Sequence, residues 1–327
     1  MIRKNKIVKK IIISLIIFIL IVGIGTCYFI GNQVFINSTQ LVTNESTSEV
    51  STNFFNTYGI NYDEFKQNYK IEKVELKSSL DGHIIPADYI YSKENKNKNS
   101  DTAILVHGLG GNRLTTYPVA EFFLENGYNV ITYDQRSSGE NTAEYTTFGY
   151  YESEDLKDYV KYANEYINNQ NLVLWGTSFG GATVGIALGD SYLNEHVDYA
   201  ILDCPVSDMR YMIKSYMKDL EVGNAIDFMV SLGNIVNRIK LGFGYDDANV
   251  CNYTSKTDVP VLIFNSKVDE LTPYFMGEDI YKSIKHDNKK IVSVEDSEHA
   301  NIWLDYNEKY KNEMQDFIKI KYLKDGE

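Results

Sequence analysis

The stretch NLVLWGTSFGGATVGIAL, residues 171–188, passes from an apolar segment through a glycine-flanked serine into a helix-like pattern. Ser178 is either a nucleophile exposed on a sharp turn or a small residue that lets a strand pack closely against a helix. The pattern Gly-x-Ser-x-Gly is short enough to arise by chance in about one chain in ten of this length. The rest of the sequence therefore decides between the two interpretations.

On both sides of this stretch, short apolar segments alternate with helix-length segments. The expected buried strands are residues 102–108, 128–135, 171–178, 197–205, 259–266 and 289–296. The expected helices are residues 114–127, 152–167, 179–192 and a closing helix at 306–323. Before them, residues 70–79 and 83–92 alternate apolar and polar side chains around a Leu-Asp-Gly turn, which predicts a hairpin. The pattern predicts an α/β fold, with a mostly parallel central sheet and helices on both faces.

Residues 206–258 do not follow this alternation of strands and helices. They contain two helix-like segments, YMIKSYMKDL and AIDFMVSLGNIVNRI, with no strand between them. Open parallel sheets bind their ligands beyond the carboxyl ends of the strands. We therefore expect a small helical cap there, inserted between two strands.

The N-terminus predicts one transmembrane helix. Residues 1–10 contain five basic and no acidic side chains, and residues 11–30 contain no charge, which is enough to span a bilayer as a helix. A cleaved signal peptide is an alternative, but no small-x-small cleavage site follows. A lipoprotein signal is another, but Thr26 before Cys27 fits it poorly. We expect an uncleaved signal anchor with residues 1–10 in the cytoplasm and the rest outside the cell, as a single-pass protein of the cell membrane.

Two segments follow the anchor. Residues 31–56 are rich in Ser, Thr and Asn and are interpreted as a stalk, and residues 57–327 as the globular domain. The 327-residue chain has a net charge of −13, and subtracting its five N-terminal bases leaves −18 for residues 31–327. Such an acidic surface repels nucleic acid and anionic lipid headgroups, so nucleic-acid binding is excluded.

The cysteine content predicts no metal site. Beyond Cys27 in the apolar segment, Cys204 and Cys251 allow at most one disulfide. No Cys/His cluster has the spacing of zinc ligands. We expect neither a metal nor an organic cofactor.

The strand before Ser178 and the helix after it match the nucleophile-elbow context. Gly176 and Gly180 then have a physical role, because any side chain there would collide with neighbouring backbone in so tight a turn. The start of the helix also directs free N–H groups and a positive dipole end towards a developing oxyanion.

A serine hydroxyl needs a base, and the chain has only five histidines. His83 lies in the hairpin, His107 ends the first parallel strand, and His196 and His286 lie in polar connections. His299 follows the last strand, where a loop at the carboxyl edge of the sheet can reach the serine. We predict His299 as the base, although an isolated loop histidine is more often an ordinary surface residue.

The base needs an orienting acid. Asp269 lies just after the strand at 259–266, in a loop at the same edge of the sheet. The order serine, acid, histidine is the one expected of this architecture. Asp269 is the predicted acid, and Asp203 and Asp208 are the reserve candidates. The alternative for Asp269 is a turn-forming aspartate.

The remaining requirement is an oxyanion hole made of backbone N–H groups. Phe179, directly after the serine, would supply one donor. The glycine-rich loop HGLGGN at 107–112 would supply the other, from Leu109. A phosphate-binding role for this loop is less favoured, because it lacks the lysine of a P-loop and the spacing of a dinucleotide-binding fingerprint.

Five motifs, LVHGLGGN, YDQRSSGEN, GTSFGG, VPVLIFNSKVDELTP and EDSEHA, occur in order across residues 70–325. In these motifs the chain resembles the α/β-hydrolase superfamily, most of all the membrane-anchored bacterial serine hydrolases called serine aminopeptidase-like or acyl esterase-like. The resemblance implies a catalytic triad of Ser178, His299 and Asp269, the oxyanion hole named above, and a cap at 206–258. In DQRSSGEN, Ser137 and Asn141 replace a glycine and a serine of the usual pattern.

The sequence thus predicts a serine hydrolase that cleaves carboxylic esters, with short peptides as the alternative substrates. A non-catalytic binding protein on the same scaffold is a third possibility, because fold does not guarantee function. This possibility is less favoured, because an enzyme that has lost its activity would be expected to lack the serine, the acid, the base or the oxyanion hole.

Overall fold

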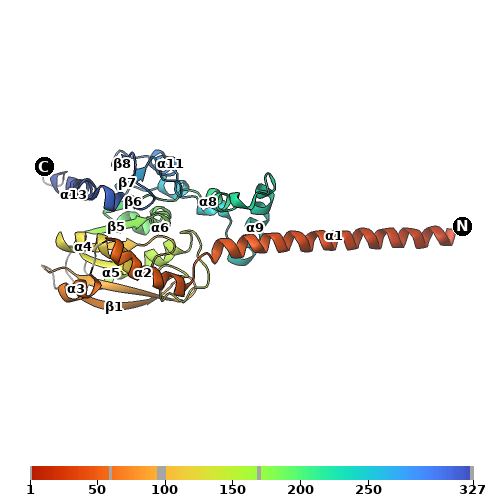
Figure 1. Ribbon diagram of the computed structural model, residues 1–327, viewed down its shortest axis with the longest axis horizontal. Helices are drawn as coiled ribbons and strands as arrows, with labels where there is room; N and C mark the ends of the chain where they lie inside the picture. Colours follow the sequence, from red (N-terminus) through yellow and green to blue (C-terminus); the bar gives the residue numbers. More distant parts are fainter. Residues whose placement is uncertain (1, 59–60, 94–100, 168–170, 325–327) are drawn as a thin grey trace. The chain divides into compact units, whose positions relative to one another are not determined.

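The computed structural model describes residues 2–58, 61–93, 101–167 and 171–324 (Figure 1). The chain divides into two compact units, each made of two separate stretches of sequence. Unit 1 comprises Met1–Leu41 and Arg210–Asp247, and unit 2 comprises Val42–Met209 and Ala248–Glu327.

Unit 2 is built on one sheet that has eight strands among the described residues, in the order β1-β2-β4-β3-β5-β6-β7-β8 (Figure 1). β1 pairs antiparallel with β2, and β2 pairs antiparallel with β4, whereas the other neighbours are parallel. The strands are β1 Lys70–Lys77, β2 Ile84–Tyr91, β3 Thr102–Val106, β4 Asn129–Tyr133, β5 Leu172–Thr177, β6 Tyr199–Asp203, β7 Val261–Ser266 and β8 Lys289–Val294. The predicted hairpin and the mostly parallel sheet are confirmed.

Helices of unit 2 cover both faces of this sheet. The described helices are α2 Asn44–Tyr58, α3 Tyr62–Asn68, α4 Tyr117–Glu125 after the 3₁₀ turn η1 Arg113–Thr116, α5 Glu152–Tyr166, α6 Phe179–Ala187, α7 Ser191–His196, α10 Cys251–Thr254, α11 Phe275–Ser283, α12 Ile302–Asp305 and α13 Asn307–Lys324. Side chains of α3, α4, α12 and α13 form one buried cluster with alternate residues of the strands. Helices α5, α6 and α11 contact strands β3, β5 and β7 on the opposite face. The inner strands β3 to β7 are therefore buried on both sides, which explains their mostly apolar sequences, whereas the edge strands β1 and β8 are partly exposed.

Unit 1 combines the N-terminal helix with most of the insertion between β6 and β7. Its elements are α1 Ile2–Thr39, α8 Met209–Tyr216, η2 Lys218–Leu220, α9 Ala225–Leu241 and η3 Tyr245–Ala248, the first residue of α8 and the last of η3 belonging to unit 2. The described part of the insertion is helical, as predicted. Part of α1 is long and apolar enough to cross a membrane.

Helix α9 packs directly on α1. A Cβ atom on Gly31 would lie 2.6 Å from the carbonyl oxygen of Leu232, and one on Gly233 would lie 2.8 Å from Cβ of Val34. Both distances are too short for real contacts, so glycine at these two positions permits the close approach of the helices. The insertion and the N-terminal helix therefore share one packed interface.

The segment predicted as a stalk is largely helical. Residues 31–39 continue α1, and residues 44–58 form α2. The side chain of Asn44 donates hydrogen bonds to the carbonyl oxygens of Gly139 and Asn141, both at 2.9 Å. The second half of this segment is thus tied to unit 2 by specific hydrogen bonds.

Candidate active site

Ser178 lies between β5 and α6 with φ 55° and ψ −115°. Non-glycine residues rarely adopt positive φ, so this backbone is strained. A Cβ on Gly176 would lie 2.6 Å from the carbonyl carbon of Gly180, and one on Gly180 would lie 2.6 Å from the carbonyl oxygen of His107. The turn therefore needs glycine on both sides of the serine, as the sequence predicted.

Gly180→Ala tests this steric requirement. The new Cβ would collide with backbone of β3, which pairs with strands on both sides and cannot move away. We expect a loss of about 3 kcal/mol or more in the free energy of unfolding, measured by urea denaturation. Gly82→Ala is the control: φ is +77° but the space is open, so only about 1 kcal/mol should be lost. Equal losses in the two variants would contradict the steric account.

His299 follows β8 and bonds to the serine. Its Nε2 lies 2.9 Å from Ser178 Oγ, and its Nδ1 lies 2.8 Å from Oδ2 of Asp269. The other four histidines have different surroundings. His83 contacts Asp81, His107 is buried and bonded to backbone, His196 bonds to the carbonyl of Tyr192, and the buried ring nitrogens of His286 have no hydrogen-bond partner among the described residues. The structure thus brings together the predicted serine, base and acid.

Asp269 is held in place by its own loop. Its Oδ1 accepts hydrogen bonds from the backbone N–H groups of Leu271 and Thr272, at 2.9 and 2.8 Å. Burial favours a higher pKa for this carboxyl, but hydrogen bonds from His299 and Thr272 outweigh it and hold the pKa below the ordinary value of 3.8. Because the folded pKa is lowered, the ionised form contributes stability at neutral pH, and this contribution is lost only as the pH falls below about 4.

Thr272 is a part of the site that sequence reasoning missed. Its hydroxyl donates to Oδ2 of Asp269 at 2.9 Å and lies 3.1 Å from Nδ1 of His299. The spacing Asp-x-x-Thr after a strand is a signal for a side-chain-capped turn. It does not reveal the contact with the histidine, which comes from another loop.

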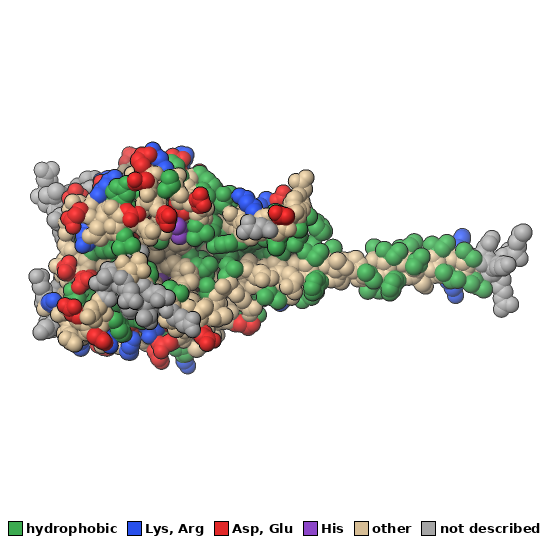
Figure 2. All heavy atoms as spheres, in the orientation of Figure 1, with side chains coloured by type: hydrophobic (Ala, Val, Ile, Leu, Met, Phe, Trp, Pro, Cys, Tyr) green, Lys and Arg blue, Asp and Glu red, His purple; other side chains and the backbone are tan. Residues whose placement is uncertain are grey.

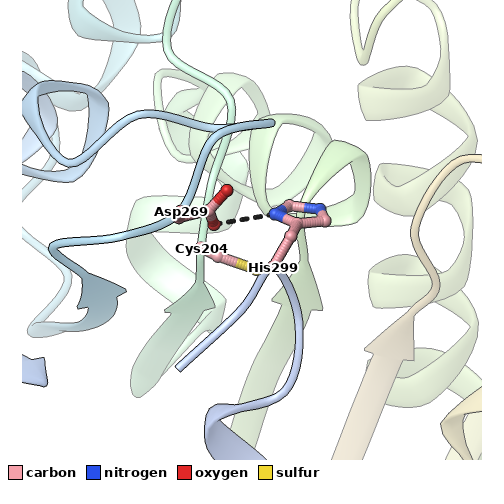
Figure 3. A group of neighbouring side chains, drawn as sticks. All are labelled: Cys204, Asp269 and His299. Atoms are coloured by element: carbon pink, nitrogen blue, oxygen red, sulfur yellow. Dashed lines mark hydrogen bonds and ion pairs between the residues drawn. The ribbon is translucent and has the colours of Figure 1, made fainter. Parts of the chain in front are cut away.

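Cys204 lies beside the acid and the base (Figure 3). One ligand atom each of Cys204, Asp269 and His299 lies within 4.8 Å of the others, so these residues could hold a metal ion. However, burial raises the pKa of the Cys204 thiol, which disfavours the thiolate that a metal requires. A metal would also displace the proton between Nδ1 of His299 and the carboxylate. Metal binding and the serine–histidine–aspartate arrangement therefore exclude each other. Cys204 and Cys251 are free thiols.

The two reserve acids have other partners. Asp203 ends β6, is buried, and accepts a hydrogen bond from the hydroxyl of Tyr310, which in turn accepts one from Trp175 Nε1 at 3.0 Å. The other carboxylate oxygen of Asp203 has no hydrogen-bond partner in the described part of the chain. Asp208 forms an isolated bridge with Asn249. The histidine is thus paired with Asp269.

Asp203→Asn should stabilise the protein at high pH. Burial raises the pKa of Asp203 to about 7, with His299 and Tyr310 lowering it and Asp269 raising it. Between pH 4 and 7 the folded state keeps a proton that the unfolded state has lost, so stability falls as pH rises. We expect the variant to exceed the wild type by roughly 1–4 kcal/mol at pH 8 and by little near pH 4.

Urea unfolding at pH 5, 6, 7 and 8 measures this difference. The exposed Asp258 provides a matched control, because Asp258→Asn removes the same charge from the surface. A stability difference for Asp203→Asn that does not change with pH would contradict the assignment.

The loop after β3 is held close to the serine. A Cβ on Gly108 would lie 3.4 Å from Cβ of Ser178. His107 Nδ1 donates to the carbonyl of Gly108, and its Nε2 accepts from the N–H of Gln135, which fixes the tautomer. Burial lowers the pKa of this imidazole, which agrees with its neutral form. Leu109 directly follows Gly108 in the same loop.

Gln135 connects this loop to the helix after the serine. Its side-chain nitrogen donates to the carbonyl of His107 at 2.5 Å, and its side-chain oxygen accepts from the hydroxyl of Thr183 at 2.6 Å. Phe179 begins that helix, and as its first residue it has an N–H without an acceptor inside the helix. Gln135 therefore links the loop after β3 to helix α6, the two elements that carry the predicted oxyanion donors.

The unusual residues of DQRSSGEN have structural roles. Ser137 has φ 59°, which explains why glycine is the usual residue there. The side chain of Asn141 donates to the carbonyl of Asp134 at 2.8 Å. Arg136 makes two hydrogen bonds to the carboxylate of Asp155, at 2.8 and 3.0 Å. This segment therefore supports the loops around the site and contributes nothing to the triad itself.

Comparisons with known proteins agree with this architecture. A family model described as alpha/beta hydrolase fold matches residues 103–222. The uncharacterized protein YqkD of Bacillus subtilis is 25% identical over 240 residues, which cover 72% of this chain and 78% of YqkD. The esterase Pf2001 of Pyrococcus furiosus has a similar structure, with a TM-score of 0.62 at 22% identity over 80% of this chain and 96% of the esterase. The esterase EaEST of Exiguobacterium antarcticum gives 0.55 at 18% identity, over 76% of this chain and all of EaEST.

Proposed function

We propose that this chain, which has the α/β-hydrolase fold, is a serine hydrolase that cleaves carboxylic esters through an acyl-enzyme at Ser178. The proposal rests on one observation, the continuous hydrogen-bond chain from the hydroxyl of Ser178 through His299 to Asp269. In this chain the nucleophile has a base, and the base has a buried anionic partner.

The proposed reaction follows from these contacts. His299 Nε2 takes the proton of Ser178 as the hydroxyl attacks the ester carbonyl, and Asp269 keeps the other ring nitrogen protonated and stabilises the imidazolium. The backbone N–H groups of Leu109 and Phe179 are the proposed donors to the oxyanion. His299 then protonates the leaving alcohol, and water attacks the acyl-enzyme with the same histidine as base.

A fluorophosphonate probe tests the nucleophile on the full-length protein. We expect the wild type to be labelled, with the adduct located at Ser178 by peptide mass spectrometry, and Ser178→Ala to remain unlabelled. Ser297→Ala is a matched control, because this buried serine follows β8 near His299 but bonds to Asp305. Absence of labelling in folded wild-type protein would refute the proposal and favour a non-catalytic binding protein.

Esters are the favoured substrates because two structurally similar proteins are esterases. Peptides are the alternative that the sequence leaves open. A panel of short- and long-chain aryl esters beside aminoacyl amides separates the two, and faster turnover of the amides would replace the esterase assignment by a peptidase.

We also propose that residues 11–30 of α1 cross the cell membrane once, with unit 2 on the outer side. Apolar side chains along this part of α1, among them Ile12, Phe18 and Ile24, are more than half exposed. Exposing these apolar side chains to water is unfavourable, and the hydrocarbon core of a bilayer shields them from it. Protease added to intact cells should digest unit 2 while residues 1–30 stay with the membrane, and a fully protected chain would refute this orientation.

A further inference from the structure

Helix α9 carries an apolar surface that stays exposed among the described residues. The side chains of Phe228, Ile235 and Ile239 are 56%, 54% and 72% exposed. At 3.6 residues per turn they lie within roughly 40° of one another around the helix. The buried positions of α9 lie on another side: Val230, Gly233, Val236 and Asn237. We call the three exposed side chains the α9 stripe.

The α9 stripe lies next to α1 just after the apolar residues 11–30, where the polar residues Asn32, Gln33 and Asn37 begin. A Cβ on Gly31 would be 2.6 Å from the carbonyl oxygen of Leu232 and 3.0 Å from Cγ2 of Val236. Gly31 directly follows the uncharged residues 11–30. Around the helix, Leu232 lies between the stripe and the contact with α1. The stripe is therefore fixed beside α1 at the level where the proposed membrane span ends.

This level corresponds to the headgroup layer of a bilayer. A helix with its side chains is about 10 Å across, and the interfacial layer outside the hydrocarbon core is roughly 5–8 Å thick on each side. A helix that touches α1 at Gly31 therefore overlaps this layer. Figure 2 shows hydrophobic side chains along α1 and on the adjoining surface of unit 1.

The charge of this part of the chain suits a membrane surface. Arg210–Asp247 contain five basic and five acidic side chains and are neutral overall, whereas residues 31–327 together carry −18. The negative charge is thus concentrated in unit 2. Anionic headgroups repel such an acidic surface but not a neutral one.

We propose that the α9 stripe inserts into the headgroup and acyl-chain boundary of the same bilayer that α1 crosses. The inference rests on the membrane anchoring proposed above and adds a second contact, made by the insertion. Lipid is the occupant, because helix α9, which carries the stripe, packs on α1 directly beside the exposed apolar residues of the proposed span, such as Phe29. Interfacial helices bury apolar side chains in this way.

Tryptophan fluorescence in vesicles tests the contact with the full-length protein. The variants Phe228→Trp, Ile16→Trp and Tyr166→Trp place an indole in the stripe, within the α1 span and on an exposed site of unit 2, respectively. Each is reconstituted in phosphatidylcholine vesicles with or without bromine near the carboxyl end of the acyl chains. The two native tryptophans, Trp175 and Trp303, are buried in unit 2 and give a constant background.

Bromine should remove roughly half of the added emission of Phe228→Trp, should also quench Ile16→Trp, and should leave Tyr166→Trp unchanged. If Ile16→Trp is quenched and Phe228→Trp is not, the inference is overturned while the anchor stands. If neither is quenched, both fail. A blue-shifted but unquenched Phe228→Trp would show that a second copy of the chain covers the stripe, which also overturns the inference.

Discussion

Ser178→Ala is expected to lower kcat on an aryl ester by about 10⁴–10⁶-fold. The substitution removes the hydroxyl that bonds to His299 Nε2 and leaves the backbone contacts of the turn intact. The N–H of residue 178 still donates to the carbonyl of Asp203 at 2.7 Å, and its carbonyl still accepts from the N–H of Ala182 at 3.2 Å. The loss should therefore appear in kcat, without unfolding.

A second substitution separates the chemistry from the strained backbone. Ser178→Gly is equally inactive, but glycine accepts φ 55° without strain. We expect Ser178→Gly to be more stable than Ser178→Ala by about 1 kcal/mol in urea unfolding. Retention of more than a small fraction of wild-type activity in either variant would show that another group is the nucleophile.

Asp269→Asn is expected to lower kcat by about 10⁴-fold with little change in KM. The backbone N–H groups of Leu271 and Thr272 hold Oδ1, so the amide oxygen of the new asparagine takes that position. Its NH₂ group then faces Nδ1 of His299 and donates to it. The imidazole proton is forced onto Nε2, which can no longer accept the proton of Ser178.

The measurement is steady-state hydrolysis of an aryl ester, together with thermal unfolding to show that the fold persists. His286→Ala is the control, because its ring lies in the connection before β8, away from the serine. It should retain activity close to the wild type. A large loss in His286→Ala, or an Asp269→Asn variant with near-normal kcat, would show that the base or the acid is misassigned.

The parts of the site that the sequence predicts are those governed by strand order. Ser178, Asp269 and His299 each follow a strand in the parallel part of the sheet, and parallel strands bring their carboxyl ends to one edge. Local pattern is sufficient there because each strand is a short apolar run and each loop is short. The glycines around the serine follow from the same tight turn.

Other features depend on contacts that local pattern does not encode. Asp203 ends β6 and Asp269 follows the neighbouring strand β7, and only the hydrogen bonds of Asp269 with its own loop and with His299 distinguish them. The hydroxyl of Thr272 joins residues of two loops that are 30 positions apart. Residues 31–56 are predicted to form a stalk, because Ser, Thr and Asn are common in linkers. In the structure most of them are helical, because tertiary packing outweighs the weak helix propensity of these residues.

The close contact between Gly31 and Leu232 joins residues about two hundred positions apart in the chain. At roughly 5–20 residues per second, a ribosome needs on the order of 10–40 s to make the intervening chain. During that time α1 exists without the helix that packs on it, although a membrane could already hold its apolar part. Unit 1 is therefore completed only after a segment made about two hundred residues later than Gly31 has left the ribosome.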